Sequence, residues 1–339
     1  MKYSGIGGQA VIEGVMMKNK DKYAIAVRKP DGEIEVKTEN CNAISGKAAF
    51  FRAPFIRGMV NFIDSLVLGM STLTYSTSFY DEEDEDDKKT PEEKAKSDKI
   101  FNVVTVIISV ILALGIFMVG PWCLSEFVLS RFIKSKSVLI LIEGLVRVLL
   151  FIGYVTLISL MKDIKRVYMY HGAEHKCINC IEHGLELNVE NVRKSSKEHK
   201  RCGTSFMLIV MCISILVLML VRFDSRILRM FARILLIPII AGISYEFLRF
   251  TGTHDNAFVN ALSKPGLLLQ GLTTREPDDE MIEVGIASVE AVFDWRAYID
   301  ENFGTKPSAA VPENDNDNEA DIGEAAPEEK RADDEQADS

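Results

Sequence analysis

The stretch that decides the fold runs from Phe101 to Val119 and reads FNVVTVIISVILALGIFMV. It carries no charged side chain. A helix of roughly 20 apolar residues is long enough to cross a hydrocarbon core about 30 Å thick. Such a run has no favourable place in water, so the sequence predicts that the chain crosses a membrane here.

Three further apolar runs follow, and we expect each to form a spanning helix: Val138–Met161, Thr204–Val221 and Ile227–Leu248. The last run carries Arg229 and Arg233 near its start, so their charged ends should snorkel to an interface and the helix should be short or tilted. The predicted fold class is therefore mainly α, a polytopic helical membrane protein with about four transmembrane helices over residues 100–250.

The charge distribution predicts an orientation. Lysines and arginines crowd the segment before the first run and the 162–203 loop, and they outnumber those of the two other short loops. The positive-inside rule therefore predicts a cytoplasmic N-terminus, a cytoplasmic 162–203 loop and a cytoplasmic C-terminus. The opening MKYSGIGGQAV lacks the basic and apolar regions of a cleaved signal, so we expect no removal of the N-terminus.

Two acidic tracts account for much of the net charge of -10. DEEDEDD at 81–87 belongs to a linker over 81–99, and residues 304–339 form an acidic tail; both are predicted to be disordered. We find no basic patch interleaved with aromatic residues, so nucleic acid is not expected as a partner. The expected partner is the lipid bilayer. The six cysteines should stay reduced in the cytoplasm.

Residues 1–80 are predicted to form a β-hairpin region followed by a membrane-associated helix. Tyr23–Lys29 and Glu33–Thr38 alternate apolar and polar residues around a Pro-Asp-Gly turn. Gln9–Met17 would add a third strand, in which Gln9 and Glu13 face one side and reach a buried site. The helix after Pro54 carries Arg57, Asn61 and Asp64 near one face.

Past the last span, residues 251–303 are predicted to hold a re-entrant or interfacial segment and then one amphipathic helix. Pro277 followed by Asp278, Asp279 and Glu280 is a typical helix start, and this helix should run to about Phe303.

The motif that could carry chemistry is His171-x-x-Glu174-His175. On a helix, histidines four residues apart share a face, so both imidazoles could bind one divalent metal ion, zinc for example. Glu174 would then act as the catalytic base on a metal-bound water. A catalytic zinc site also needs a third protein ligand and one open position.

The predicted topology nominates Glu246 as the third metal ligand, because it is an acid in apolar surroundings where the fourth span reaches the same membrane face. His254 and Asp255 are the alternatives. A different set of ligands, Cys177, Cys180, His199 and Cys202, has the spacing of a structural zinc knuckle. A histidine pair without a metal is the third alternative. Arg52 and Arg57 could contact an anionic lipid headgroup, or anchor the chain beside the membrane.

Five motifs in the same order resemble the YqhQ-like family of bacterial multi-pass membrane proteins: GGQAVIEGVMM at 7–17, RAPFIRG at 52–58, YHGAEHK at 170–176, RCGTSF at 201–206 and TTREP at 273–277. The resemblance covers roughly residues 5–300. It implies a domain of unknown function in predicted metal-dependent enzymes of the bacterial inner membrane. It also implies that the family motifs include Gln9, Glu13, His171, Glu174, His175, Cys202, Gly203, Thr204 and Ser205.

These features predict a membrane protein with a cytoplasm-facing His/Glu site that hydrolyses a lipid-linked or membrane-proximal substrate. The alternative is a non-enzymatic scaffold or transporter component, in which a structural metal or hydrogen-bonded histidines hold the 162–203 loop.

Overall fold

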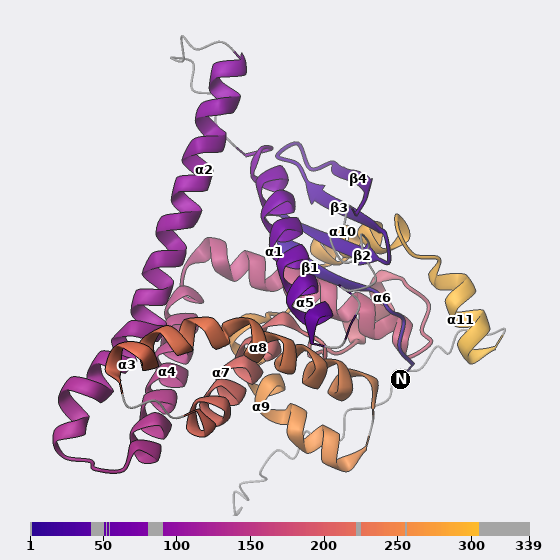
Figure 1. Ribbon diagram of the computed structural model, residues 1–339. Helices are drawn as coiled ribbons and strands as arrows, with labels where there is room; N and C mark the ends of the chain where they lie inside the picture. Colours follow the sequence, from indigo (N-terminus) through magenta and orange to yellow (C-terminus); the bar gives the residue numbers. More distant parts are fainter. Residues whose placement is uncertain are drawn as a thin grey trace, which may run out of the picture.

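A computed structural model describes residues 2–41, 51, 53, 55–80, 91–221, 225–254 and 256–304 (Figure 1). Its sheet has four antiparallel strands in the order β1 (Gly7–Val11), β2 (Gly14–Asn19), β3 (Lys22–Arg28) and β4 (Ile34–Asn40). The helices are α1 (Ile56–Thr77), α2 (Pro91–Leu114), α3 (Gly120–Cys123), α4 (Lys136–Ile158), α5 (Lys162–Glu182), α6 (Val189–Lys194), α7 (Gly203–Leu220), α8 (Arg226–Thr253), α9 (Ala257–Thr273), α10 (Asp279–Glu290) and α11 (Trp295–Phe303).

Four helical segments are long and apolar enough to cross a membrane: 103–131, α4, α7 and 231–253 within α8. This confirms the predicted helical fold class. Figure 1 shows them to one side of the molecule, with the sheet, α10 and α11 on the other. The first segment continues past Val119, the predicted end, through two π-helical turns (Gly115–Val119 and Leu124–Val128) on either side of Pro121. Proline removes one helical hydrogen bond, and such wider turns accommodate the loss.

Arg233 of α8 differs from the prediction that it snorkels to an interface, whereas the side chain of Arg229 lies outside the described residues. Arg233 is buried, and its guanidinium donates to the Glu143 carboxylate of α4 at 2.8 Å. Arg147 donates to the same carboxylate at 3.1 Å and to Ser214 of α7. Opposite charges inside a helical bundle neutralise one another, so Arg233 links α4 to α8 instead of reaching water.

The N-terminal region confirms the hairpin of β3 and β4 but not a single strand over Gln9–Met17. The chain turns back after Val11, and β1 pairs with β2 so that Gln9 lies opposite Met16. Glu13 occupies the turn with a positive φ of 50°. Gln9 and Glu13 therefore do not share one strand face, and that prediction is wrong because the turn lies between them.

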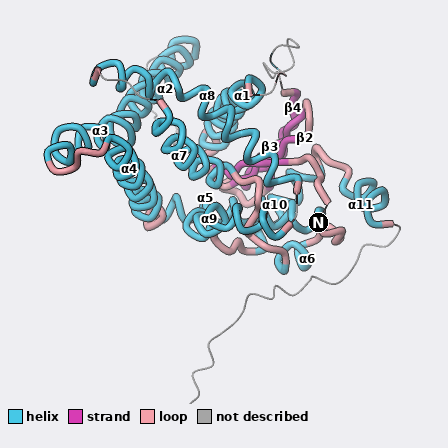
Figure 2. Tube along the Cα trace, turned by 60° about the horizontal axis from the view of Figure 1, so that its bottom comes forward, coloured by secondary structure: helices cyan, strands magenta, loops and turns pink. Residues whose placement is uncertain are grey.

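The sheet lies between helices on both faces. Val15, Met17 and Ala26 belong to the main core with α5 and α10. Residues of the opposite face, Val11, Met16, Tyr23, Ile25 and Val27, pack against Leu68, Leu73 and Tyr75 of α1. Strands buried on both faces lose the clean alternation of a half-exposed sheet, which is why GVMM and AIAV read as continuous apolar runs. Figure 2 shows the sheet beside α10 and α5.

The C-terminal region forms two helices where the sequence predicted one. Asp278 caps α10 by accepting from the Met281 amide, and Asp294 caps α11 by accepting from the Ala297 amide. The second cap is a helix start inside the expected helix, so the chain breaks there. The predicted interfacial segment contains α9. In the predicted linker, α2 already begins at Pro91, a favoured first helical position, whereas residues 81–90 and the tail from 305 lie outside the described residues.

Gly172 allows the 275–277 segment to cross α5. A Cβ at this position would lie 2.0 Å from the carbonyl oxygen of Arg275. The Arg275 amide in turn donates to the Tyr168 carbonyl of α5 at 2.9 Å. The added Cβ would meet the backbone of Arg275, so the clash could not be relieved by rotation of a side chain.

We expect Gly172→Ala to destabilise the protein by about 1–3 kcal/mol, the usual cost of overpacking. The measurement is thermal unfolding of the purified protein in detergent. Gly271→Ala in α9 is the matched control, since a Cβ there meets nothing within 4 Å. Equal melting temperatures for the two variants would contradict the close approach.

Candidate functional site

Helix α5 carries the HxxEH motif and is buried along its second half, from Tyr170 to Glu182 apart from His171. One side packs into the main core through Tyr170, Ile178 and Ile181. The opposite side carries polar residues that hold the 193–198 segment: Lys176 donates to the carbonyls of Arg193 and Ser195, and Asn179 to those of Ser196 and Glu198. A helix in this position can hold its side chains rigidly.

His171 and His175 share a face of α5, with ring centroids 4.4 Å apart. The Nδ1 atom of His171 lies 2.9 Å from the Thr273 carbonyl oxygen, and that of His175 lies 2.6 Å from the Lys197 carbonyl oxygen. A carbonyl oxygen only accepts, so both Nδ1 atoms must carry the proton. When such a ring is neutral, its Nε2 atom has the free lone pair.

The third member of the group is Cys202, the residue before α7. Its Sγ lies 3.3 Å from Nε2 of His171 and 3.1 Å from the Thr204 hydroxyl. Ligand atoms of His171, His175 and Cys202 all lie within 4.8 Å of one another. Among the described residues this is the only group of three or more His, Cys, Asp or Glu that meets this criterion. Two ligands of a tetrahedral zinc ion, one nitrogen and one sulfur, would be about 3.6 Å apart.

The electrostatics of the group favour the ligand form of the cysteine. Burial raises the pKa of the Cys202 thiol, but His171 and His175 outweigh burial and hold that pKa well below its ordinary value. Burial likewise lowers the pKa of His171, yet the Cys202 thiolate outweighs this and raises it. A thiolate is the form of cysteine that binds metals.

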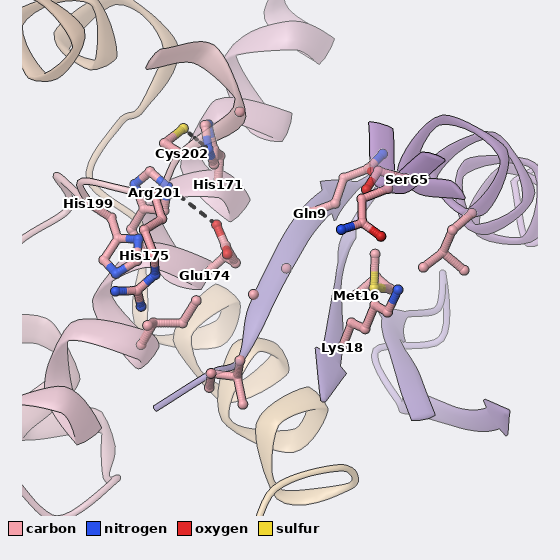
Figure 3. A pocket seen from close by; sticks show the side chains of 18 of the residues that line it. Gln9, Met16, Lys18, Ser65, His171, Glu174, His175, His199, Arg201 and Cys202 are labelled. Atoms are coloured by element: carbon pink, nitrogen blue, oxygen red, sulfur yellow. Dashed lines mark hydrogen bonds and ion pairs between the residues drawn. The ribbon is translucent and has the colours of Figure 1, made fainter. Parts of the chain in front are cut away.

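Glu174 is buried beside the group, with Oε2 3.5 Å from Nε2 of His175. Gly8 of β1 makes room for it, because a Cβ at that position would lie 2.8 Å from Cγ of Glu174. The glycine of the N-terminal GGQ motif therefore lets the sheet edge approach the site. Figure 3 shows Glu174 below the histidines, facing the strand that carries Gln9.

A cavity of about 540 Å³ opens beside these side chains. His171, Glu174, His175 and Cys202 line one part of it, together with His199 and Arg201. Gln9, Lys18 and Ser65 line the opposite part (Figure 3). The side chains of His171, His175 and Cys202 therefore face this cavity.

The structure does not bring Glu246 to the group. Its two carboxylate oxygens accept from the guanidinium of Arg57 at 2.7 and 2.6 Å, which joins α1 to α8. Cys202, and not Glu246, lies beside the two histidines. Arg57, predicted to contact an anionic headgroup, is engaged in this ion pair. His254 contacts the Phe250 carbonyl and is outside the group, while Arg52 and Asp255 lie outside the described residues.

The zinc-knuckle set is also not gathered. Cys177 packs at Gly285 of α10, where an added Cβ would meet its Sγ at 2.9 Å. The Sγ of Cys180 points to the carbonyls of Leu185 and Glu186, whereas Cys202 contacts His171. Cys177 and Cys180 therefore belong to core packing, because α5 continues through both and ends at Glu182, before Gly184.

The remaining motif residues support the group from outside. Thr204 contacts the Cys202 thiol, and Ser205 accepts a hydrogen bond from Gln270 of α9 at 2.8 Å. Gln9 lies against Gly69 of α1 and lines the cavity. Glu13 accepts from Arg166 and from the Tyr170 hydroxyl, so it fixes the β1–β2 turn onto α5 away from the cavity.

A second buried polar cluster, missed from the sequence, adjoins the site. Glu182 accepts from the Ser4 amide, the Ser4 hydroxyl and Arg201, and lies 3.6 Å from Nε2 of His199. The His199 ring centroid is 5.6 Å from that of His175. The spacing of His175 and Glu182, seven residues on one helix face, is a signal that could have identified Glu182.

Glu182 should make the stability of the protein depend on pH. Burial raises the pKa of this carboxyl, but His199 and Arg201 outweigh burial and lower it from 4.5 to about 2. A lowered folded-state pKa contributes stability above the unfolded value and loses it as the pH falls through the folded value.

We therefore expect Glu182→Gln to cost about 3 kcal/mol at neutral pH and progressively less as the pH falls from about 4.5 to 2. Unfolding of wild type and variant across this pH range measures the effect. A difference that stays constant with pH would show that the Glu182 charge is not linked to folding.

Comparisons with known proteins agree with the motifs. A family model described as "Protein of unknown function (DUF1385)" matches residues 53–295. The "Uncharacterized protein YqhQ" of Bacillus subtilis (strain 168) is 36% identical over 317 residues, which cover 90% of this chain and 96% of that protein. No solved structure matches. The chain therefore belongs to the DUF1385 family of unknown function, to which its motifs at the cavity and in the sheet had pointed.

Proposed function

We propose that this protein is a membrane-bound, metal-dependent hydrolase in which His171, His175 and Cys202 bind a divalent ion, zinc by preference. The observation that carries the proposal is the commitment of both Nδ1 atoms to backbone carbonyls. Metal-binding histidines characteristically donate their second ring nitrogen in this way, which orients the ring and fixes the tautomer. Two nitrogens and a thiolate suit zinc, which accepts both types of ligand.

Three protein ligands leave a tetrahedral ion with one open position, as in catalytic zinc sites. A bound ion would supply a water of lowered pKa and polarise the bond to be cleaved. Glu174 lies in the cavity wall next to His175, where its carboxylate can take a proton from that water and return it to a leaving group. His199 also lines the wall, and burial lowers its pKa, which favours the neutral ring.

We further propose that the site faces the cytoplasm of a bacterial cell. With four spans, the segment before the first, the 162–202 segment and the segment after the last all lie on one side of the membrane. The basic residues of the 162–201 segment favour the cytoplasmic side. Both chain ends would then be cytoplasmic, and the substrate would be membrane-proximal.

The alternative function is a scaffold or transporter component with a structural site. It is favoured by the fact that His171 and His175 each join α5 to a separate segment, at Thr273 and at Lys197. In that case the histidines would hold the segments without an open coordination position.

Metal analysis of the purified protein tests the ligand set. We expect about one equivalent of zinc in wild type and close to none in His175→Ala or Cys202→Ser, because each removes one of three ligands. Cys180→Ser is the matched control, since Cys180 is equally buried and lies outside the group. Unchanged metal content in the His175 variant would refute the proposed centre.

Cobalt substitution distinguishes the catalytic site from the structural one. We expect the visible spectrum of the Co²⁺ protein to change on addition of azide, because an open position accepts an anion. Glu174→Gln should keep its Co²⁺ and the azide response, since Glu174 is assigned as a base and not as a ligand. A spectrum that is indifferent to azide would favour the scaffold, and loss of metal in Glu174→Gln would contradict the role of that residue.

A further inference from the structure

The cavity at the metal-ligand group does not end in the polar region. A second cavity of about 560 Å³ shares part of its wall, including Gln9, Asn61, Ser65 and His171. Beyond this shared wall the lining becomes largely apolar, with Phe62, Val167, Phe206, Met207 and Leu248. The lining changes from polar to apolar where α1 meets α7 and α8, and the latter two are helices that can span a membrane.

A third cavity extends the apolar space into the membrane region. It has a volume of about 580 Å³ and shares Phe62, Phe206 and Met207 with the second. From there it follows α7 as far as Leu218, between α2, α4 and α8. Its polar lining includes Arg147 and Arg233, which are paired with Glu143. The three cavities thus follow one another, through shared wall residues, from His171 to the space between the membrane-spanning helices.

We propose that the site takes an anionic lipid, whose headgroup occupies the polar cavity and whose acyl chain occupies the apolar cavities between α1, α7 and α8. This inference rests on the proposed function and names its substrate class. Burial of each methylene contributes about 0.8 kcal/mol, so an acyl chain gains from the apolar cavities what a water-soluble substrate does not. A lipid chain also reaches this space directly from the bilayer.

The charge of the polar cavity selects the headgroup. Lys18 of β2 and Lys20 in the β2–β3 turn line it, and neither has a carboxylate partner in the described part of the chain. Arg201 adds a third cation to the wall, already paired with Glu182. Glu174 is the acid that faces them. Such a lining favours a phosphate or another anion at the headgroup.

A bulky side chain at the boundary between the first and second cavities would block the proposed path of the acyl chain. The Asn61 amide donates to the Tyr245 hydroxyl at 2.8 Å, and Ser65 lies one helical turn further along α1. Ser65 has an exposed side chain that lines both cavities, so a tryptophan there would fill the passage without entering the core. Leu66, the next residue, is 51% exposed and lines none of the three cavities, which makes it the matched control.

The experiment uses the full-length protein in phosphatidylcholine nanodiscs and a phosphatidic acid probe with a photoreactive group on its acyl chain. We expect labelled peptides from α1 and α7 in wild type and in Leu66→Trp, and about tenfold less label in Ser65→Trp. Replacing Lys18 and Lys20 by glutamine should reduce labelling about fivefold per lysine. If Ser65→Trp does not fold, Met207→Trp blocks the apolar side instead, with the same expected loss.

Equal labelling of the blocked variant and Leu66→Trp would overturn the inference, because the lipid would then be bound only around the helices. Equal labelling by the matching photoreactive diacylglycerol would refute an anionic headgroup. Displacement of the probe by inorganic phosphate alone would contradict the lipid, because it would indicate an anion site that does not bind the acyl chain. Zinc content is measured in the same samples: normal labelling without zinc contradicts the proposed hydrolase, and normal zinc with labelling independent of Ser65 contradicts the lipid.

Discussion

The hydrogen bonds from His171 to Thr273 and from His175 to Lys197 are the constraint on which the rest of the site depends. Each imidazole is held by a carbonyl from a different segment, and so each ring presents Nε2 toward Cys202. The two carbonyls are fixed in turn, one at the end of α9 and one in the segment held by Lys176 and Asn179. Lys176 and Asn179 thus hold the 193–198 segment over α5 and, through the Lys197 carbonyl, help to orient His175.

The sheet-bearing part of the molecule packs against both α5, which carries His171 and His175, and α1. The sheet packs on α5 through its main core and on α1 through its other face, while α1 itself is joined to α8 by the ion pair of Arg57 and Glu246. Cys202 comes directly before α7. The group of His171, His175 and Cys202 therefore lies where the sheet-bearing part and the spanning helices meet, and the cavities beside it differ in polarity for that reason.

Glu246 and Arg57, both candidate site residues in the sequence, join α8 to α1 as an ion pair. Glu246 and Arg57 both stand out as charges in apolar surroundings, and such charges are expensive unless they are paired. The two charges neutralise each other, which lowers the free-energy cost of placing them there, although they lie 189 positions apart in the sequence. A single buried acid therefore indicates a partner as readily as it indicates a metal site, and the sequence does not say which partner lies close.

The sequence by itself determined the local features, because these depend on spacing and hydropathy along the chain. The charge-free run at 101–119 required a spanning helix, and the four-residue spacing of His171 and His175 placed them on one face of α5. Caps and turns inside apolar stretches were less evident, as at Glu13 and Asp294.

Only the tertiary structure decided which distant residues complete the site. Cys202 rather than Glu246 approaches the histidines, because the start of α7 is held beside α5 whereas Glu246 is held by Arg57. Gly8 and Gln9 line the cavity because β1 passes beside Glu174. The spacing and hydropathy of the sequence do not indicate this contact. Spacing fixes the direction of a side chain on its own helix, but the packing of helices and sheet fixes what that side chain meets.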